Sequence, residues 1–253
     1  MFKRRVFYLS GFDPRGGRFY HALHQEQLAK HAALTGETIT ISERKRVGGK
    51  CVDWTVANAT AQAETQFSFL QWDDLIRKSW ITDPLLLGWK TISAYCAILC
   101  YGDLRAAWKH DKVRLIALFY PPLAVLLLPL LAALLIALPL LLVLEWWVAL
   151  PLGLVAGVLL TRGFLIRLRV FWLIRLFIHN HEIARRGFDP TLDQRLDQFA
   201  QSMSAALDVG HDEVLLIAHS NGAILAVPLL VIVRIILDNI RETRPLATLI
   251  SNR

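Results

Sequence analysis

The longest apolar stretch of the chain runs from Leu115 to Leu144 without a charged residue, and apolar character resumes from Trp146 to Thr161 after Glu145. A bilayer-spanning helix needs about 20 apolar residues, so this region is long enough for two. Tryptophans favour the membrane–water interface, which puts the turn near residues 139–147. We therefore predict a two-helix transmembrane hairpin. A buried hairpin of a soluble domain is the alternative, although uncharged runs of this length rarely occur outside membranes.

Basic residues flank both ends of the hairpin and indicate its orientation. Because positive side chains accumulate on the cytoplasmic side, both flanks are expected to be cytoplasmic. An even number of spans also returns the chain to the side that it left. We thus expect an integral protein of the inner or plasma membrane whose soluble part faces the cytoplasm. The basic residues are Arg105, Lys109, Lys112 and Arg114 before the hairpin and Arg162, Arg167, Arg169 and Arg175 after it.

Outside the hairpin, short apolar or alternating segments predict strands, and longer periodic segments predict helices. Their alternation is typical of an α/β fold, in which a mostly parallel sheet is covered by helices. Strands are expected at residues 6–9, 38–42, 67–72, 213–218 and 246–250, helices at 19–33, 192–207 and 223–237, an interfacial helix at 164–178, a loop at 43–50, and an apolar approach to the membrane at 86–101.

The same pattern divides the chain into three parts. Residues 1–105 form the N-terminal part of the sheet domain, residues 106–178 the hairpin with its basic flanks, and residues 179–253 the C-terminal part of the sheet domain. The two sheet-forming parts have to meet in one domain, which requires the chain to return to the same side of the membrane. The transmembrane hairpin therefore interrupts the sheet domain.

The amino-acid composition limits the kinds of partner that the protein is expected to bind. The formal charge of +7 agrees better with membrane orientation and attraction to anionic lipid headgroups than with nucleic-acid binding, because no basic motif interleaved with aromatic residues is present. With 55% hydrophobic residues, the chain is expected to have the lipid bilayer as a partner. Cys51, Cys96 and Cys100 form no disulfide framework, and no histidine pair accompanies them at zinc spacing. We expect neither a metal nor another cofactor.

The segment with the clearest chemical meaning is Ala218-His219-Ser220-Asn221-Gly222, which joins an apolar run ending at Ala218 to another beginning at Ala223. This is the layout of a nucleophile elbow, a tight strand-to-helix turn that lifts a serine out of the backbone. Small residues are needed beside the serine because strand and helix nearly touch there, and Ala218 and Gly222 meet that need. The pattern indicates that Ser220 is a nucleophile. A plain turn in which Ser220 caps the helix is the alternative.

Together with its preceding strand and the early turn Tyr8-Leu9-Ser10-Gly11-Phe12, this segment resembles the α/β-hydrolase superfamily, in particular its bacterial lipase- and esterase-like members. In that family, the loop after an early strand and the residue after the nucleophile each donate one backbone N–H to the oxyanion hole. The resemblance implies that Phe12 (or Gly11) and Asn221 are these donors. It also implies hydrolysis of carboxylic esters, and the position of the site near the bilayer points to lipid-derived ones.

A serine nucleophile needs a histidine as its base and an acid that orients the histidine, and the family supplies both after the elbow. Beyond Ser220 this chain contains Asp238 and Glu242 but no histidine. We therefore expect the chain to be a truncated product of a longer hydrolase, whose acid and histidine lie beyond Arg253. A degenerate, non-catalytic relative is the alternative.

The sequence thus favours a membrane-anchored serine hydrolase with Ser220 as its nucleophile. The main alternative is a membrane scaffold, a pseudo-hydrolase that keeps the fold without catalysis. A transporter is a third option, but two spans with no charge except Glu145 leave little to line a pathway. The acidic pair Asp73-Asp74 is expected to be a solvated loop with no part in catalysis.

Overall fold

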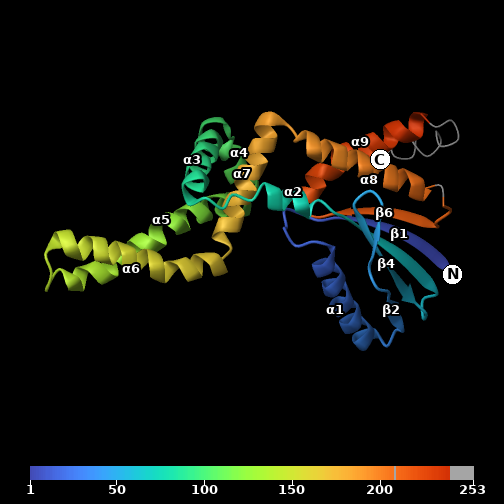
Figure 1. The fold of residues 1–253 in the computed structure, drawn as a ribbon, viewed down its shortest axis with the longest axis horizontal. Coiled ribbons are helices and arrows are strands. Elements are labelled where there is room, and N and C mark those ends of the chain that lie inside the picture. Colours follow the sequence, from blue (N-terminus) through green and yellow to red (C-terminus); the bar gives the residue numbers. More distant parts are fainter. Residues whose placement is uncertain (208, 240–253) are drawn as a thin grey trace. The chain divides into compact units, whose positions relative to one another are not determined.

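The computed structural model describes residues 1–207 and 209–239 (Figure 1). It divides into two compact units: a sheet unit of residues 1–79 with the described residues from 188 onward, and a helical unit of residues 80–187. The boundaries expected from the sequence were residues 105/106 and 178/179. The helical unit extends further on both sides, because the helices that flank the hairpin pack with it. The strand expected at residues 246–250 lies outside the described residues.

Within the described residues the sheet has six strands: β1 (Phe2–Leu9), β2 (Ile39–Ile41), β3 (Lys45–Val47), β4 (Cys51–Asn58), β5 (Ala63–Leu70) and β6 (Glu213–Ala218). Their order is β2-β4-β5-β1-β6, and β3 pairs with β4. β1 is parallel to both β5 and β6, whereas β4 is antiparallel to β2, β3 and β5. The sheet is therefore mixed, and the prediction of a mostly parallel sheet is wrong.

The antiparallel part of the sheet follows from short connections. β3 lies in the basic segment 43–50, which was expected to be a loop, and β4 begins directly after the turn at residues 48–50. The connection from β4 to β5 at residues 59–62 is equally short. Parallel neighbours need a crossover of about a dozen residues or more, so these strands can pair only antiparallel. The strand expected at residues 213–218 is confirmed with the same ends, and those expected at residues 6–9, 38–42 and 67–72 are confirmed with shifted ends.

Helices cover both faces of the sheet: α1 (Gly17–Thr35) lies on one side, and α8 (Pro190–Leu207) and α9 (Asn221–Asn239) lie on the other (Figure 1). On the α1 side, the ring of Tyr20 stacks on Phe69 with the centroids 4.9 Å apart. On the α8 side, Leu196 and Phe199 are fully buried. The short helix α2 (Asp73–Lys78) follows β5 closely. The predicted α/β layering is confirmed.

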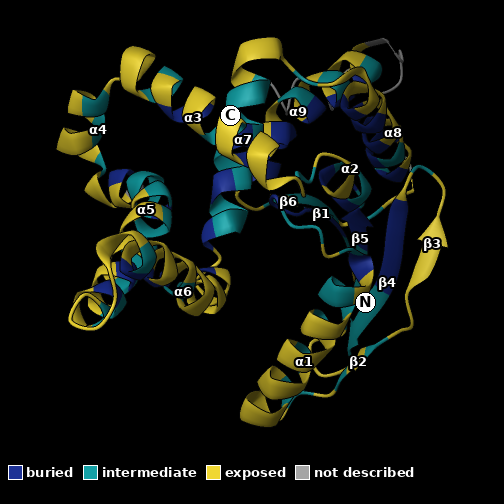
Figure 2. Ribbon diagram, turned by 60° about the vertical axis from the view of Figure 1, so that its left-hand side comes forward, coloured by how far each residue is buried: buried dark blue, intermediate teal, exposed yellow. Residues whose placement is uncertain are grey.

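α9 follows the Ser220 turn and packs against α8, β1 and β6. Leu225, Leu229, Val233 and Leu237 are at most 2% exposed and recur every four residues, which places them on one face of the helix (Figure 2). This stripe buries α9 against the sheet unit. The helix predicted at residues 223–237 is therefore a covering helix of the sheet.

The helical unit comprises α3 (Pro84–Tyr101), α4 (Leu104–His110), α5 (Lys112–Leu140), α6 (Trp146–Arg167) and α7 (Val170–Arg186). α5 and α6 form the predicted helical hairpin, with the turn at residues 141–145. Among the described residues, four helical segments are long and apolar enough to cross a membrane, at 84–101, 115–140, 146–167 and 221–238. This is consistent with membrane association. The segment at 84–101 was expected only as an apolar approach to the membrane.

Small residues bring α5 and α6 into close contact. Gly153 and Gly157 of α6 stand four residues apart and face Ala133 and Ala137 of α5. A Cβ atom built on Gly153 would lie 2.7 Å from the Cβ atom of Ala137, and one built on Gly157 would lie 2.6 Å from the backbone nitrogen of Ala133. Such pairs of small residues let helices approach closely within a membrane, where packing rather than the hydrophobic effect drives association.

The interfacial helix expected at residues 164–178 is divided between α6 and α7. The division falls at Arg169, whose φ of 56° lies in the left-handed region and cannot continue a right-handed helix. Beyond it, α7 buries Val170, Ile174 and Ile178 along one face. The amphipathic pattern predicted for this segment therefore belongs mainly to α7.

Candidate active site

Ser220 stands in the turn between β6 and α9 and is exposed. Its φ is 55°, in the left-handed region that few residues other than glycine occupy. Two backbone hydrogen bonds close the turn, from Gly222 N to His219 O and from Ala223 N to Ser220 O, both 2.9 Å long. Residues held in such conformations cluster at functional sites. The turn therefore holds Ser220 in a strained backbone conformation.

The Ser220 turn lies directly against the loop that follows β1. A Cβ atom built on Gly222 would lie 2.7 Å from the carbonyl oxygen of Ser10, and still closer to that of Leu9. One built on Gly11 would lie 2.8 Å from the Cβ atom of Ser220 and 3.3 Å from its hydroxyl oxygen. Both glycines are needed for this close approach. The structure thus brings Gly11 and Ser220 together, as the parallel pairing of β1 with β6 requires.

Hydrogen bonds from two directions fix the start of the loop after β1. The backbone nitrogen of His219 donates to the carbonyl oxygen of Leu9 at 3.0 Å. The indole nitrogen of Trp72 donates to the carbonyl oxygen of Ser10 at 2.9 Å. Trp72 and Ser10 are both buried, so this bond satisfies two polar groups that water does not reach. The loop is therefore held beside the serine by residues that follow both neighbouring strands, β5 and β6.

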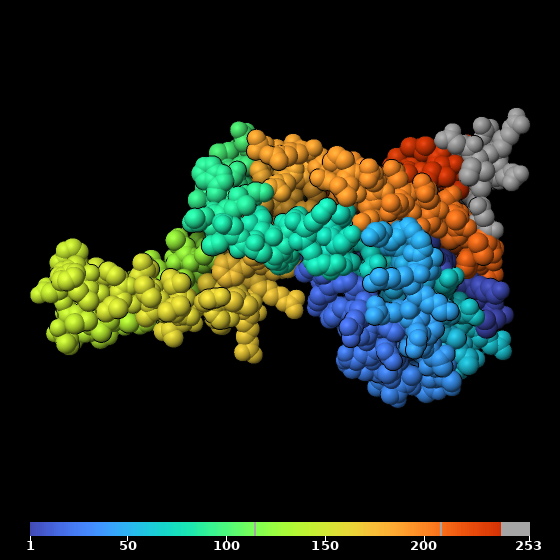
Figure 3. Space-filling model, viewed as in Figure 1, coloured from blue at the N-terminus to red at the C-terminus, as the bar shows by residue number. Residues whose placement is uncertain are grey.

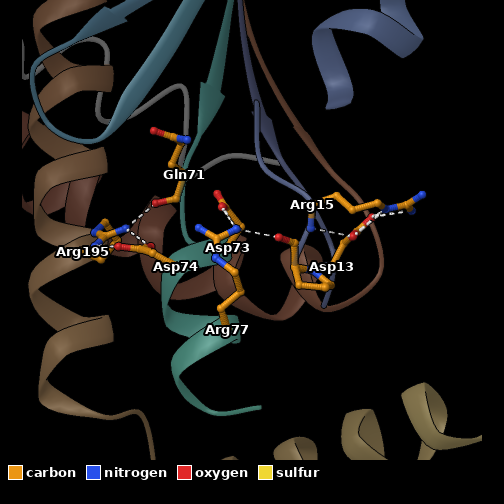
Figure 4. A network of polar contacts seen from close by, with 8 residues as sticks. Asp13, Arg15, Gln71, Asp73, Asp74, Arg77 and Arg195 are labelled. Atoms are coloured by element: carbon orange, nitrogen blue, oxygen red, sulfur yellow. Dashed lines mark hydrogen bonds and ion pairs between the residues drawn. The ribbon is translucent and has the colours of Figure 1, made fainter. Parts of the chain in front are cut away.

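Polar side chains anchor the rest of this loop (Figure 4). Arg15 donates to both oxygens of the Asp13 carboxylate at 2.6–3.0 Å, and the hydroxyl of Tyr20 donates to it at 3.0 Å. Arg77 donates to the carbonyl oxygen of Pro14 at 2.6 Å. Burial by itself would raise the pKa of Asp13, but the hydrogen bonds from Arg15 and Tyr20 outweigh it and lower the pKa. The ionised carboxylate keeps the loop in place.

The other residues of the expected site surround Ser220 in different environments. Phe12 is 2% exposed and Asn221 is 6% exposed, so both are interior residues beside an exposed serine. Ala218 is half-buried at the end of β6, and His219 is exposed. Phe12 and Asn221 are therefore enclosed by packed neighbours.

A base for Ser220 is not found within residues 1–207 and 209–239: no histidine or acidic side chain there forms a hydrogen bond with its hydroxyl. Two histidines have structural partners instead. Nδ1 of His24 accepts a hydrogen bond from Trp54 at 3.0 Å, and the ring of His211 lies 3.2 Å from the carbonyl oxygen of Ala206. Among the described residues, Ser220 therefore has no hydrogen-bonded group that could accept its proton.

Asp73 and Asp74 are not the solvated pair that the sequence suggested. Asp73 is 3% exposed and forms an ion pair with Arg77 at 2.6 Å. Asp74 receives both ends of the Arg195 guanidinium at 2.8 and 2.9 Å (Figure 4). These hydrogen bonds, more than any other interaction, hold the pKa of Asp74 below its usual value. Arg195 lies on α8, 121 residues away, so no local pattern could indicate the pair.

Comparisons of the chain with protein-family models, curated proteins and solved structures found no match. Its fold and site define its class: a mixed α/β protein that combines a sheet unit with apolar helices long enough to cross a membrane, and that carries a serine in a left-handed strand-to-helix turn.

Proposed function

We propose that the protein is a membrane-anchored serine hydrolase that acts on carboxylic esters through Ser220. The observation that carries this proposal is the left-handed backbone of Ser220, packed against the loop at Gly11. Backbone strain of this kind costs about 1–3 kcal/mol and is often part of a mechanism. Here it occurs at an exposed serine beside the buried residues Phe12 and Asn221.

In the proposed reaction, the hydroxyl oxygen of Ser220 attacks the carbonyl carbon of an ester, and the serine proton passes to a base. The bond from that carbon to the alcohol oxygen then breaks, and the alcohol leaves with a proton. Water hydrolyses the acyl-serine, which releases the acid and restores the hydroxyl. The backbone N–H groups of Phe12 and Asn221 stabilise the charge on the carbonyl oxygen, and the positive end of α9 adds to this effect.

The apolar helices support a substrate drawn from the membrane. Four helical segments of the described chain are long and apolar enough to span a bilayer, and basic residues on both flanks of the α5–α6 hairpin favour a cytoplasmic position for the sheet unit. An esterase held at this surface meets lipid-derived esters at high local concentration. We therefore propose lipid esters as the substrate class.

The test is labelling of Ser220 by a fluorophosphonate, with and without added imidazole. The protein is purified in detergent, and mass spectrometry identifies the labelled residue. Free imidazole can accept the serine proton and so can replace a missing base. Labelling with imidazole therefore tests whether the turn can react, and labelling without it tests whether the protein has its own base. Ser220→Ala is expected to abolish labelling. The control Ser93→Ala, which removes an exposed serine of α3, is expected to leave labelling unchanged.

Labelling of Ser220 in buffer alone would support a hydrolase with its own base. Labelling that requires imidazole would support a competent nucleophile and oxyanion hole without a base. A folded protein that is not labelled at Ser220 under either condition would overturn the enzyme proposal. The membrane scaffold without catalysis would then be the better description.

A further inference from the structure

An apolar groove of about 630 Å³ lies in the helical unit, between α4 and the first part of α5. The two helices pack against each other and are joined by the single residue Asp111. The groove shares no residue with the Ser220 turn or with the loop after β1. Apart from one arginine, its lining consists of apolar and aromatic side chains, among them Leu104 and Trp108 of α4 and Leu115, Phe119 and Leu123 of α5.

The groove lies at the end of the α5–α6 hairpin that is expected to meet the membrane surface. The first of the two apolar segments of the hairpin begins at Leu115, and the second ends at Arg167. The hydroxyl of Tyr120, which also lines the groove, donates a hydrogen bond to the carbonyl oxygen of Leu168 at 3.0 Å. This bond holds the groove beside the end of the second segment. The groove therefore lies where the basic flanks of the hairpin begin.

The groove is open toward the surroundings of the hairpin, which are expected to be lipid. Ile116 and Leu123 in its lining are 65% and 49% exposed. In Figure 3 the side chains of the hairpin, in yellow-green and yellow, are uncovered over most of its length on the face that is drawn. From residue 115 to residue 123 the helix rises about 12 Å, close to the roughly 15 Å of hydrocarbon in one leaflet. The groove therefore matches one acyl chain in length.

The arginine in the lining is Arg105, which is exposed and forms no ion pair within the part of the chain that the structure describes. The carboxylate of Asp103, two residues away, instead accepts a hydrogen bond from a backbone nitrogen of α4 at 2.9 Å. The ammonium group of Lys112 lies 5.6 Å from the centroid of the Trp108 ring. Residues 103–114 carry four lysines and arginines but two aspartates, so positive charge prevails beside the groove.

An apolar groove with an unpaired arginine at a membrane surface matches a phospholipid. Arginine can bind phosphate through two parallel N–H groups, and basic pockets between membrane helices on the cytoplasmic side bind anionic headgroups. A zwitterionic headgroup also carries a cation, which the neighbouring lysines repel. We propose that the groove binds one anionic phospholipid, with its phosphate on Arg105 and one acyl chain along Leu115, Phe119 and Leu123. The proposal rests on the membrane position of the hairpin, which is part of the proposed function, but not on hydrolysis at Ser220.

The first experiment is native mass spectrometry of the full chain, purified in detergent and freed of lipid. The probes are phosphatidylglycerol and phosphatidylcholine with the same acyl chains. Phosphatidylglycerol is expected to bind about tenfold more tightly, because its headgroup has no cation to face the basic residues beside the groove. Equal binding of the two lipids to the folded protein would overturn the proposal.

A matched pair of variants separates the groove from general electrostatic attraction at the membrane surface. Arg105→Gln removes the cation of the lining and is expected to reduce the preference for phosphatidylglycerol to less than about threefold. Arg167→Gln removes the same charge at the end of α6, outside the lining, and is expected to keep the preference within about twofold of the wild-type value, because salt screens distant surface charges. Both arginines are exposed, and thermal unfolding checks that both variants are folded. An equal loss of preference in the two variants would contradict the assignment.

A second measurement locates the lipid on the protein. Phosphatidylglycerol with a photoreactive group on one acyl chain is added to the protein in phosphatidylcholine nanodiscs, and mass spectrometry identifies the crosslinked residues. Crosslinks are expected at Trp108 and residues 115–123, and they are expected to decrease in Arg105→Gln but not in Arg167→Gln. Crosslinks spread evenly over the exposed leucines of α5 and α6 would indicate bulk lipid and overturn the proposal. A dimer of the chain that keeps the groove free of crosslinks would overturn it as well.

Extraction of membranes with alkaline carbonate distinguishes failure of the lipid site from failure of the membrane anchor. A chain that stays in the membrane but shows no preference for phosphatidylglycerol would overturn the lipid site alone. A chain that carbonate releases would overturn both the lipid site and the membrane anchor of the proposed function. Fluorophosphonate labelling of Ser220 is expected to be the same in Arg105→Gln as in the wild type, so the hydrolase proposal is tested separately.

Discussion

The indole nitrogen of Trp72 donates a hydrogen bond to the carbonyl oxygen of Ser10 at 2.9 Å. Ser10 follows β1 directly and Trp72 comes shortly after β5, and the two strands are parallel neighbours. Their carboxyl ends therefore meet at one edge of the sheet. The same edge carries the end of β6 and the turn with Ser220. This buried bond is thus one of the anchors of the loop that Ser220 contacts.

Trp72→Phe is expected to destabilise the protein by about 1–3 kcal/mol, because the buried carbonyl oxygen of Ser10 loses its donor. The ring that fills the core is largely kept, so the protein is expected to fold. The loop at Gly11 then loses one of its anchors, and fluorophosphonate labelling of Ser220 is expected to slow. Chemical denaturation in detergent measures the first effect. Trp89→Phe is the control, because Trp89 is 69% exposed, and an equal loss of stability there would contradict the prediction.

Ser220→Gly is expected to yield a more stable protein than Ser220→Ala, by about 1 kcal/mol. Both variants remove the hydroxyl, but only glycine adopts the left-handed φ of 55° without strain. The measurement is the denaturant midpoint of the two variants side by side. A more stable alanine variant would show that the backbone of this turn is unstrained, and it would remove the main support for the elbow.

Acid is expected to weaken the sheet unit through His24. Burial, and then repulsion from His21, lowers the pKa of His24, and the neutral ring accepts the hydrogen bond from Trp54. Below the ordinary histidine pKa of about 6.5, the unfolded chain binds more protons than the folded one. This stabilisation is therefore fully present above that pH and is lost as the pH falls.

The measurement is the denaturant midpoint at about pH 7.5 and pH 5.5, which is expected to be lower at the acidic pH. His24→Gln keeps an acceptor for Trp54 but does not titrate, so it is expected to reduce the difference between the two midpoints. His110→Gln changes an exposed histidine of α4 and is expected to leave the difference as it is. A wild-type midpoint that rises on acidification would contradict the assignment.

Gly157→Leu is expected to disrupt the α5–α6 hairpin. A side chain at Gly157 would meet the backbone of Ala133 and Pro129 on α5, and overpacking of this kind typically costs about 1–3 kcal/mol. Gly163→Leu is the matched control on the same helix, because among the described residues no atom outside its own stretch of helix lies within 4 Å of a Cβ built there. Resistance of the hairpin to unfolding by dodecyl sulfate in mixed micelles measures the effect. Equal losses in both variants would show that the close approach at Gly157 does not stabilise the hairpin.

The local sequence was sufficient to predict the features that depend on neighbouring residues. The hairpin followed from the length of the uncharged run, because a bilayer imposes a minimum span. The Ser220 turn followed from its small residues, because a strand and a helix can approach closely only where side chains are small. The glycine at position 222 meets that need in the structure, and so does Gly11 from the facing loop.

Features that depend on pairing between distant segments could be identified only from the tertiary structure. No local pattern shows that Arg195 pairs with Asp74, that Trp72 holds Ser10, or that β3 and β4 form the wall of a cavity with α8. Each of these contacts joins segments that are far apart in the sequence, and no repeating pattern of residues indicates that they pair. Hydropathy placed the apolar helices, but the packing of α9 against α8 and the sheet was decided by tertiary contacts, because an apolar helix can bury its faces against protein as well as against lipid.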